Sequence, residues 1–543
     1  MKIRSVFLIV FAGIFFLNSC TKDKVYTNPY EGGKESLGVY FDLAVAPDPA
    51  VGTEGTIVDF SVTGLLPYKD SLNFFFNGQP AEIIAVTDNS LKVKIPEFAS
   101  SGITLLKVQD QLFVGPHFSV EGKISIDPEF TLKGGANNSI NDFLILPDGR
   151  FIFVGNFTNY DNKGVVSPIR HIARAYNTGA MDGTFNTEGS NGSINSILGI
   201  GSNYFVGGNF STFYYNNGKS NISSINNLTR LGENGAVDSI KVETYSTKFT
   251  GLLKAVPAFN GGTDASIRKI FNYQDKIIAI GDFKYFLSHS YDLSTVPVIV
   301  GDTTIIRDSI TTDSIRMPQV ARFKLDGSLD KTFHFNNSTQ TGLDAGNGVI
   351  SDGYLQDDGK LILVGNFTKF DGASTNRIVR LNTDGSIDKT FNTGTGADKA
   401  INSITYNAST RKYLLTGQFN SFNGTASKRL VMLNSDGSID NSFSSKDFGN
   451  GYPTYAIQIS DGKIVVSGVF DSYNQINRPN FMILDNKGSL AKGYNSSGEL
   501  NGSVKKIYES ISSQGKLTLL LIGNFTEFDG QAVSNITRIV LDK

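Results

Sequence analysis

The sequence predicts an all-β protein, a β-sandwich followed by a seven-bladed β-propeller, and three observations carry this prediction. Glycine and aromatic residues are abundant, with 57 glycines, 40 phenylalanines and 21 tyrosines among 543 residues. Short apolar segments alternate with turn residues over most of the chain, which is typical of strands joined by tight turns. From residue 122 onward these segments recur with a period of about 50 residues, and each period has room for the four strands of a propeller blade.

Each repeat is marked by an apolar strand that ends in Gly-x-Phe. An Asp-Gly pair precedes several of these strands, as at Asp358-Gly359, and the glycine suits a hairpin turn because it tolerates positive φ. A further strand and a Ser-x-Asp-x-x-Phe element complete the repeat. The seven copies of the marker are Gly155-Asn156-Phe157, Gly208-Asn209-Phe210, Gly281-Asp282-Phe283, Gly365-Asn366-Phe367, Gly417-Gln418-Phe419, Gly468-Val469-Phe470 and Gly523-Asn524-Phe525.

The ends of the repeat region predict a closed ring. The seventh copy stops at residues 538–543 and lacks its Ser-x-Asp-x-x-Phe element, whereas an additional copy of this element stands before the first repeat, at residues 125–130. We predict that this N-terminal strand completes the last blade, because closure removes two open sheet edges. The propeller is expected to span residues 122–543.

The repeats resemble the delta-60 type repeats of a family of bacterial propeller proteins of unknown function. The resemblance covers roughly residues 124 to 543, and it is strongest at residues 325–330, 383–388 and 435–440, which read Asp-Gly-Ser followed by an aliphatic residue and Asp. The sixth copy departs from this pattern, with Ala491 in place of the acid. The resemblance implies the propeller fold and brings no activity with it.

Residues 1–19 are predicted to be a lipoprotein signal peptide. Lys2 and Arg4 precede an apolar run over residues 6–17, and this run is shorter than the about 20 residues that a membrane-spanning helix needs. The segment from Leu17 to Cys20 resembles the bacterial lipobox. The resemblance implies that Cys20 becomes the lipid-modified first residue of the mature chain.

Residues 20–36 are expected to form a flexible tether. Thr21-Lys22-Asp23-Lys24 resembles the charged export tag that follows the lipid-bearing cysteine in surface lipoproteins of Bacteroidota. This resemblance implies a protein anchored in the outer membrane and exposed at the cell surface. The alternative is a solvated tether whose charges do not act as an export signal.

Residues 37–121 are expected to form a separate β-sandwich, because short alternating segments bounded by turn residues recur along them. The positions of its turns, among them Asn77-Gly78 and Ser101-Gly102, resemble those of the immunoglobulin-like IPT/TIG family. Such domains act as spacers or interaction modules, so the resemblance implies no chemistry.

Composition excludes several classes of function. Lys and Arg number 49 against 51 Asp and Glu, so the chain has no electrostatic preference for nucleic acid. One cysteine forms no internal disulfide, and four scattered histidines show no metal-ligand spacing. We therefore expect no metal and no cofactor.

No catalytic residues are expected either. The sequence shows no Ser/His/Asp constellation, and the absence of tryptophan removes the Trp-bearing sialidase motif. Two alternatives stay open. One is a carbohydrate-active lyase or hydrolase, because carboxylates that meet across a ring are not visible in a sequence. The other is a glycan-binding role, which would rely on Tyr or Phe.

Repeated charges are interpreted as architecture. An arginine recurs in the third strand of the repeat, and we expect it to make a blade-to-blade hydrogen bond or salt bridge repeated by symmetry; the alternative is a converging cationic surface. The aspartates of the repeat are explained by turn chemistry rather than by calcium. The arginines are Arg174, Arg230, Arg322, Arg380 and Arg538.

Function is expected where the repeats are interrupted. Two insertions qualify, at residues 242–266 and 285–317. The second carries a candidate loop for a partner or ligand, formed by Tyr285, Phe286, His289 and Tyr291. It also carries Asp-Ser/Thr-aliphatic tripeptides, which resemble O-glycosylation sites of Bacteroidota and make candidates of Thr303, Ser309 and Ser314.

Together these features favour a non-catalytic surface lipoprotein whose propeller binds another envelope protein or a ligand. By family analogy, the expected partner is a TonB-dependent transport complex of the SusC/SusD kind. The alternatives are a carbohydrate-active propeller enzyme, a glycan-binding protein, and a purely structural subunit of an outer-membrane assembly.

Overall fold

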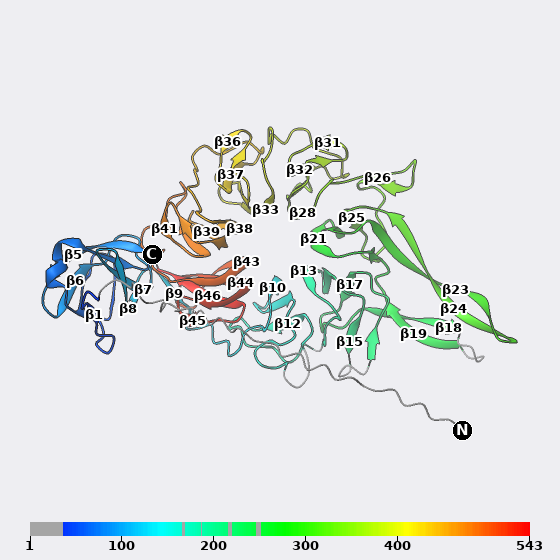
Figure 1. Ribbon diagram of the computed structural model, residues 1–543. Helices are drawn as coiled ribbons and strands as arrows, with labels where there is room; N and C mark the ends of the chain where they lie inside the picture. Colours follow the sequence, from blue (N-terminus) through cyan, green and yellow to red (C-terminus); the bar gives the residue numbers. More distant parts are fainter. Residues whose placement is uncertain (1–35, 165–168, 186, 216–219, 246–250, 543) are drawn as a thin grey trace, which may run out of the picture.

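The computed structural model describes residues 36–164, 169–185, 187–215, 220–245 and 251–542. The predicted signal peptide and Cys20 lie outside these residues. An N-terminal β-domain is followed by a ring of β-sheets that surround a common axis (Figure 1). In the part of the chain that the structure describes, no helix is long and apolar enough to cross a membrane.

The N-terminal domain is one folded-over sheet with the strand order β1-β3-β6-β5-β4-β7-β8-β2. All neighbours are antiparallel except β2 and β8. Its elements are β1 (Tyr40–Phe41), β2 (Val51–Gly52), β3 (Ile57–Thr63), the 3-10 helix η1 (Leu66–Ser71), β4 (Leu72–Phe76), β5 (Gln79–Val86), β6 (Ser90–Lys94), β7 (Gly102–Val108) and β8 (Gln111–Val120).

A phenylalanine core holds this domain together. Alternate residues of β3 are buried, as the two-residue period of a strand requires, and the Phe60 ring lies 4.9 Å from Phe74 and 6.0 Å from Phe118. The two layers of the domain are continuous with each other in their hydrogen bonding. Strand β5 pairs with both β4 and β6, and its irregularity between Ile83 and Ala85 lets one sheet continue around the core.

The ring is built from sheets whose strands follow one another from the axis outward. The inner strands are β10 (Ile140–Ile145), β13 (Ile194–Ile200), β21 (Ile267–Tyr273), β28 (Ile350–Leu355), β33 (Ile401–Asn407), β38 (Gly451–Gln458) and β43 (Leu500–Ile511). The middle strands are β11 (Phe151–Gly155), β14 (Asn203–Gly208), β22 (Lys276–Gly281), β29 (Leu361–Gly365), β34 (Lys412–Gly417), β39 (Ile464–Phe470) and β44 (Leu517–Phe528).

The third strands are β12 (Ile172–Ala175), β17 (Leu228–Leu231), β25 (Val320–Phe323), β32 (Ile378–Leu381), β37 (Leu430–Asn434), β42 (Phe481–Leu484) and β46 (Ile536–Leu541). Short strands decorate the ring: β15 (Phe213–Tyr215), β16 (Ser220–Ile222), β20 (Gly262–Thr263), β26 (Phe335–Asn336), β27 (Thr341–Gly342), β30 (Lys369–Phe370), β31 (Ala373–Ser374), β35 (Ser421–Phe422), β36 (Thr425–Ala426), β40 (Ser472–Tyr473), β41 (Ile476–Asn477) and β45 (Gln531–Ala532).

The ring closes as the sequence predicts. Strand β9 (Ile124–Ile126) pairs antiparallel with β46, so that Ile126 lies opposite Ile539 and Ile124 lies opposite Leu541. The first strand of the propeller region thus belongs to the same sheet as its last strand. This pairing covers an edge that would otherwise be open.

Among the described residues, the expected fourth strand is reduced to a single bridge in six repeats, whereas β9 forms a regular fourth strand in the closing sheet. Leu381 pairs with Ile387, and equivalent isolated bridges occur in other repeats. The chain then turns because Asp388 Oδ1 accepts a hydrogen bond from the backbone N of Thr390 over 2.9 Å. This local turn competes with strand pairing, so the regular part of these sheets ends at the third strand.

The repeated Gly-x-Phe has a steric cause. A Cβ atom on Gly365 would lie 2.0 Å from the carbonyl oxygen of Val349 on the adjoining chain segment, so the position admits glycine alone. The phenylalanine that follows, Phe367, is fully buried between neighbouring sheets. Glycine therefore permits the close approach of two strands, and Phe fills the space between sheets.

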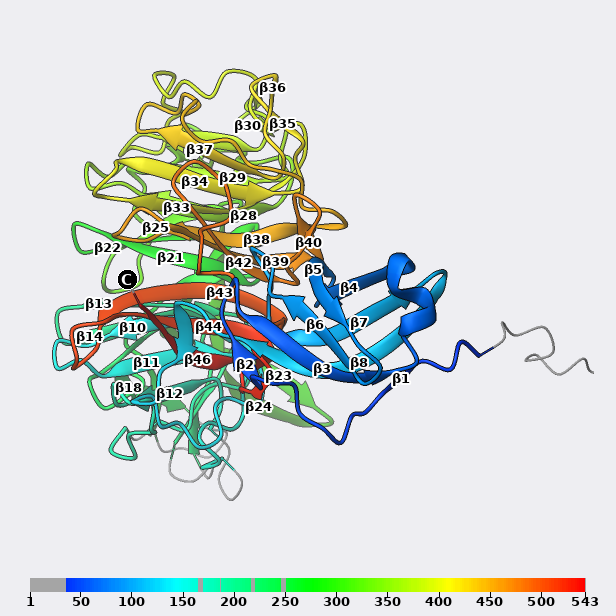
Figure 2. The ribbon, with the colours of Figure 1, turned by 90° about the vertical axis from the view of Figure 1, so that its left-hand side faces the viewer.

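Two further hairpins interrupt the ring. Strands β18 (Ser239–Tyr245) and β19 (Gly251–Pro257) form one, and β23 (Tyr285–Val300) and β24 (Thr303–Arg316) form the other. They contact each other and project together from the rim (Figure 1). The N-terminal domain lies against a different part of the ring, beside β40 and β41 (Figure 2).

Candidate functional site

A cavity of about 680 Å³ lies at the centre of the ring, and we call it the central channel. Residues from all the inner strands line it. Its volume falls within the roughly 300–1,000 Å³ typical of ligand sites. Because every repeat contributes at the same strand position, the wall of the channel is determined by the fold rather than by one loop.

A β-bulge places a polar side chain in the channel from each inner strand. In β10 the pairing with β11 passes from Ile140 to Asp142 and skips the residue between them. Bulges displace a side chain from the regular alternation of the strand. The equivalent shift occurs in every inner strand. The skipped residues, which all line the channel, are Asn141, Asn195, Arg268, Ser351, Asn402, Thr454 and Lys505.

Three asparagines of this set tie neighbouring sheets together. Asn141 Nδ2 donates to the carbonyl of Ile194 over 3.1 Å, and Asn195 Nδ2 donates to the carbonyl of Ile267 over 2.8 Å. Asn402 makes a longer contact of the same kind, 3.4 Å to the next inner strand. Their amides are therefore used mainly to fix the position of the wall.

Ion pairs occupy the next position along the same strands. Lys269 Nζ lies 2.7 Å from Asp352 Oδ1, and Lys506 pairs with Asp142. Asp352 Oδ2 also accepts the backbone N–H of Ile404 over 3.0 Å. These two carboxylates are therefore already engaged by lysines and backbone groups of neighbouring sheets.

Lys505 is different because it has no acidic partner. Its Nζ donates to Asn141 Oδ1 over 2.6 Å, and among the described residues no carboxylate lies within ion-pair distance of it. The side chain reaches solvent inside the channel, but the surrounding walls reduce its hydration. This desolvation lowers the pKa of Lys505 below the ordinary value for lysine.

Two tyrosines supply an aromatic section of the wall. The rings of Tyr354 and Tyr406 lie 5.0 Å apart, and Tyr413 packs 4.8 Å from Tyr406. Desolvation, with a smaller contribution from Asp357 and Tyr406, raises the pKa of Tyr354 to about 12. The phenol is therefore neutral at physiological pH and offers an aromatic face together with a hydroxyl group.

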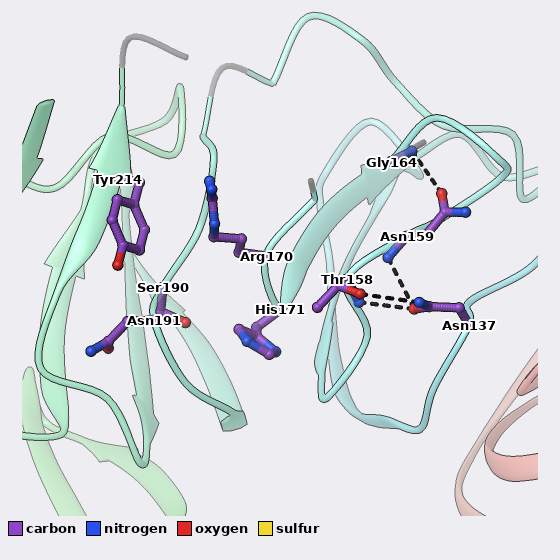
Figure 3. Close-up of a pocket in the computed structure, with 9 residues that line it drawn as sticks. All are labelled: Asn137, Thr158, Asn159, Gly164, Arg170, His171, Ser190, Asn191 and Tyr214. Atoms are coloured by element: carbon purple, nitrogen blue, oxygen red, sulfur yellow. Dashed lines mark hydrogen bonds between the residues drawn. The ribbon is translucent and has the colours of Figure 1, made fainter. Parts of the chain in front are cut away.

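A second cavity of about 610 Å³ opens near the rim (Figure 3). There the Arg170 guanidinium lies 4.5 Å from the centre of the Tyr214 ring, and the buried Nδ1 atom of His171 has no hydrogen-bond partner. Desolvation lowers the pKa of His171. On the opposite wall, Asn137 Oδ1 accepts the backbone N–H of Thr158 over 2.8 Å. Gly164, the last described residue before residues 165–168, also lines the cavity.

The predicted partner loop is a β-hairpin, and its four named residues have different environments. Tyr285 is 42% exposed. Phe286 is only 4% exposed and packs 5.8 Å from Phe323, so it belongs to the core between sheets and is not available to a partner. The expected surface role of Phe286 is therefore wrong, because its position in the strand faces inward.

His289 and Tyr291 belong to the same hairpin and are largely engaged within the protein. His289 Nε2 lies 3.1 Å from Asn226 Nδ2, and its backbone N–H donates to Asn260 Oδ1 over 2.8 Å. Burial lowers the pKa of His289 and raises that of Tyr291, whose hydroxyl oxygen is buried without a partner. The hairpin points away from the central channel (Figure 1), so these residues do not meet those of the channel.

The candidate glycosylation residues lie in the return strand of this hairpin. Ser314 is exposed and pairs with Leu287 of β23. Thr303 and Ser309 belong to β24, but their side chains lie outside the described part of the structure. Glycosylation at the three positions stays a prediction.

The repeated arginines make the contacts expected for an architectural role. Arg322 Nε donates to Asp330 Oδ2 over 2.7 Å, and Arg322 Nη1 reaches the carbonyl of Thr383 in the following repeat over 2.7 Å. The guanidinium also lies 4.6 Å from the centre of the Phe333 ring. Arg174, Arg230, Arg380 and Arg538 each donate from Nε to an aspartate in the same way. Among the described residues, no group of three or more His, Cys, Asp or Glu is placed to hold a metal ion.

The channel residues were missed by sequence reasoning. A signal exists in three repeats, where an isoleucine that begins an inner strand is followed by asparagine, at Asn141, Asn195 and Asn402. The other four repeats carry different polar residues at this position. Their common role becomes visible only when the bulge brings them to one wall.

Comparison with family models matches the two parts of the chain separately. The model described as a domain of unknown function (DUF5122) beta-propeller matches residues 356–391, 408–443 and 459–490. These matches confirm a repeat propeller of the delta-60 kind in this part of the chain. A second domain of unknown function, DUF5008, matches residues 14–116. No curated protein sequence matches the chain.

The solved structures that match share little sequence with this chain. The WD40 β-propeller domain of Doa1 is 10% identical, with a TM-score of 0.39, and the match covers 78% of this chain and 97% of that one. An auxiliary nutrient binding protein from Bacteroides ovatus is 11% identical, with a TM-score of 0.20 and coverage of 68% and 94%. Similarity at this level does not bear on function.

Proposed function

We propose that this chain is a non-catalytic surface lipoprotein whose seven-bladed propeller binds a ligand or an envelope protein, as an accessory subunit of a transport complex. The central channel is the observation that carries the binding role. Its wall combines fixed amides, ion pairs, two tyrosines and one unpaired lysine, and the lining residues come from every inner strand. Such a wall offers groups that can bind a ligand.

The finer description of the fold is part of this proposal. The inner strands β10, β13, β21, β28, β33, β38 and β43 each begin one blade, which supports a count of seven. The single aromatic core of the N-terminal domain supports an immunoglobulin-like module of the IPT/TIG kind. In this arrangement the N-terminal domain is a spacer between the membrane anchor and the ring.

The location rests on the sequence at the N-terminus. A lipid on Cys20 anchors the protein in the outer membrane, and the following Lys-Asp-Lys directs it to the cell surface. A TonB-dependent complex of the SusC/SusD kind is the proposed partner, because surface lipoproteins of this type act beside such transporters.

Purification of the native protein from membranes in a mild detergent tests this function. We expect a transporter or porin to co-purify, and we expect Cys20→Ala to abolish membrane attachment. A protein that purifies alone contradicts the accessory role. Protection of the propeller from protease added to intact cells contradicts surface exposure, and turnover of a polysaccharide by the purified protein contradicts the non-catalytic assignment.

A further inference from the structure

We propose that the central channel is a binding site for a small organic anion, whose carboxylate, sulfate or phosphate group lies against Lys505. This inference rests on the proposed binding role and specifies its chemistry. It follows from the charges of the channel wall, from the free hydroxyl of Thr454 on a strand next to that of Lys505, and from the size and aromatic content of the cavity.

The charges of the wall are unbalanced in favour of cations. The cationic residues that line the channel are Arg268, Lys269, Lys505 and Lys506, and the acidic ones are Asp142 and Asp352. The two acids are paired with Lys506 and Lys269, and Arg268 pairs with Asp282 over 3.0 Å. Lys505 remains as the positive charge that the described residues do not neutralise.

The surroundings of Lys505 favour an anionic ligand over an empty site. Lys505 is part of a channel wall that removes much of its water, which is why its pKa is lowered. The side chain is nevertheless exposed to the solvent of the channel, so a ligand can reach its ammonium group. An anion beside the ammonium supplies the missing negative charge. Its hydrogen bonds to the ammonium replace the interactions with water that the channel wall removes.

A further group is positioned to bind the same ligand. Thr454 comes from β38, one of the two inner strands that adjoin β43, and so lies on the strand next to that of Lys505. The hydroxyl of Thr454 makes no hydrogen bond with any described residue of the protein. A hydroxyl donates well to an anionic oxygen, so this group is available to the ligand.

The cavity also has room for an organic portion. Its volume of about 680 Å³ exceeds that of an inorganic ion and fits a molecule of sugar or dicarboxylate size. The faces of Tyr354 and Tyr406 form an apolar section of the same wall. The ligand is therefore expected to carry an anionic group and a carbon framework together.

Calorimetric titration of the full mature protein in detergent tests the site. The probes are sulfate, phosphate, citrate and galacturonate, with galactose as the neutral counterpart of galacturonate. We expect at least one anion to bind, with galacturonate tighter than galactose. Lys505→Met is expected to weaken anion binding at least about tenfold, because a hydrogen bond to a charged group is worth roughly 1.5–3 kcal/mol and 1.4 kcal/mol is a factor of ten.

Lys516→Met is the matched control, since Lys516 makes an exposed ion pair with Asp542 and does not line the channel. It should leave anion affinity unchanged. Lys505→Gln provides a second variant that keeps a polar side chain, and thermal unfolding shows whether either variant is folded. Absence of binding by all four anions up to about 10 mM overturns the proposal. Equal affinities of folded Lys505 variants and the parent protein also overturn it.

This result is separable from the test of the proposed function. If the Lys505→Met protein co-purifies with its envelope partner but no longer binds anions, both proposals stand. If no partner co-purifies while the anion binds through Lys505, the accessory role fails and the channel site stands.

Discussion

Arg538 Nε donates to Asp127 Oδ2 over 2.6 Å, and this pair joins the last strand of the propeller to the segment that follows its first strand. The same geometry links Arg380 to Asp388 within one repeat, over 2.8 Å. Asp127 therefore has the same role in the closing sheet as the aspartate of the Ser-x-Asp element has in the other repeats. The ion pair and the pairing of β9 with β46 together make the ring continuous.

Removal of this carboxylate should destabilise the ring. Asp127 is 2% exposed, and Asp127→Ala leaves the guanidinium of Arg538 without its anion. Loss of one member of a buried pair costs about 3–5 kcal/mol, so the free energy of unfolding measured with urea should fall by roughly this amount. Asp447→Ala is the control, because the Asp447–Lys428 pair is exposed on both sides and should contribute less than about 1 kcal/mol. Equal effects of the two substitutions would argue against a structural role for the closing pair.

The repeated aspartates should also make the ring sensitive to acid. Burial opposes ionisation of Asp330, but hydrogen bonds from Lys276 and Thr332 and the charge of Arg322 outweigh it and lower the pKa. Asp182 and Asp388 are lowered for similar reasons. A carboxyl with a lowered pKa in the folded state binds fewer protons than in the unfolded state, so it stabilises the protein above the unfolded pKa of about 3.9.

Stability should consequently fall as the pH decreases below about 4 and continue to fall through the folded-state pKa values. The measurement is the free energy of unfolding between neutral pH and about pH 2. Asp388→Asn should make this dependence shallower and lower the stability at neutral pH. A pH profile of the variant that is parallel to that of the parent protein would contradict the assignment.

The glycine of the Gly-x-Phe element should be sensitive to the smallest substitution. In Gly365→Ala the new methyl group would lie 2.0 Å from a backbone carbonyl oxygen, so two strands must separate. Such overpacking costs about 1–3 kcal/mol or more. Gly183→Ala is the control, since a Cβ atom at Gly183 has no neighbour within 4 Å and the residue does not have a positive φ. Thermal unfolding of the two variants measures the difference, and a Gly365→Ala protein as stable as the control would refute the steric explanation.

The sequence predicts the ring better than it predicts the channel, and the reason is physical. The ring follows from side chains that repeat at fixed spacing, such as Gly365 and Phe367, because strand contact and core filling demand those residue types. The channel depends on a backbone bulge that turns one side chain of each inner strand toward the axis. Residues of different chemistry occur at this position, among them Asn141, Ser351 and Lys505. Such chemical variety hides the position in the sequence.

The N-terminal domain and the hairpins show the same limit. Alternation predicts the strands of the N-terminal domain, but β5 joins its two layers through an irregularity that has no marker in the sequence. In the insertion at residues 285–317, alternation also decides which side chains face inward. Phe286 is buried and Tyr285 is exposed, a distinction that depends on the register of β23 with its neighbours.

Arg478 should hold the N-terminal domain against the ring. It is 3% exposed and donates from Nη2 to the carbonyl of Phe98 over 2.5 Å, and from Nη1 to Ser100 Oγ over 3.4 Å. Desolvation lowers the pKa of Arg478 to about 10, so the side chain stays charged at neutral pH while its hydrogen bonds join the two parts. Arg478→Ala leaves the Phe98 carbonyl without this donor and opens a space at the interface.

We expect this variant to loosen the domain junction without unfolding the ring, because it removes the buried donor at the junction and leaves the sheets of the ring intact. The hydrogen bonds from Ser101 N to Ser496 O, 2.8 Å, and from Asn477 Nδ2 to Asn77 O, 3.1 Å, remain. Limited proteolysis should cut near residues 121–123 faster than in the parent protein, and the cleaved propeller should stay folded. Lys492→Ala removes only exposed ion pairs at the same junction and is the control. Cleavage of Arg478→Ala at the rate of the control would show that the buried guanidinium does not hold the junction, since a buried hydrogen bond from a charged group should contribute more than an exposed ion pair.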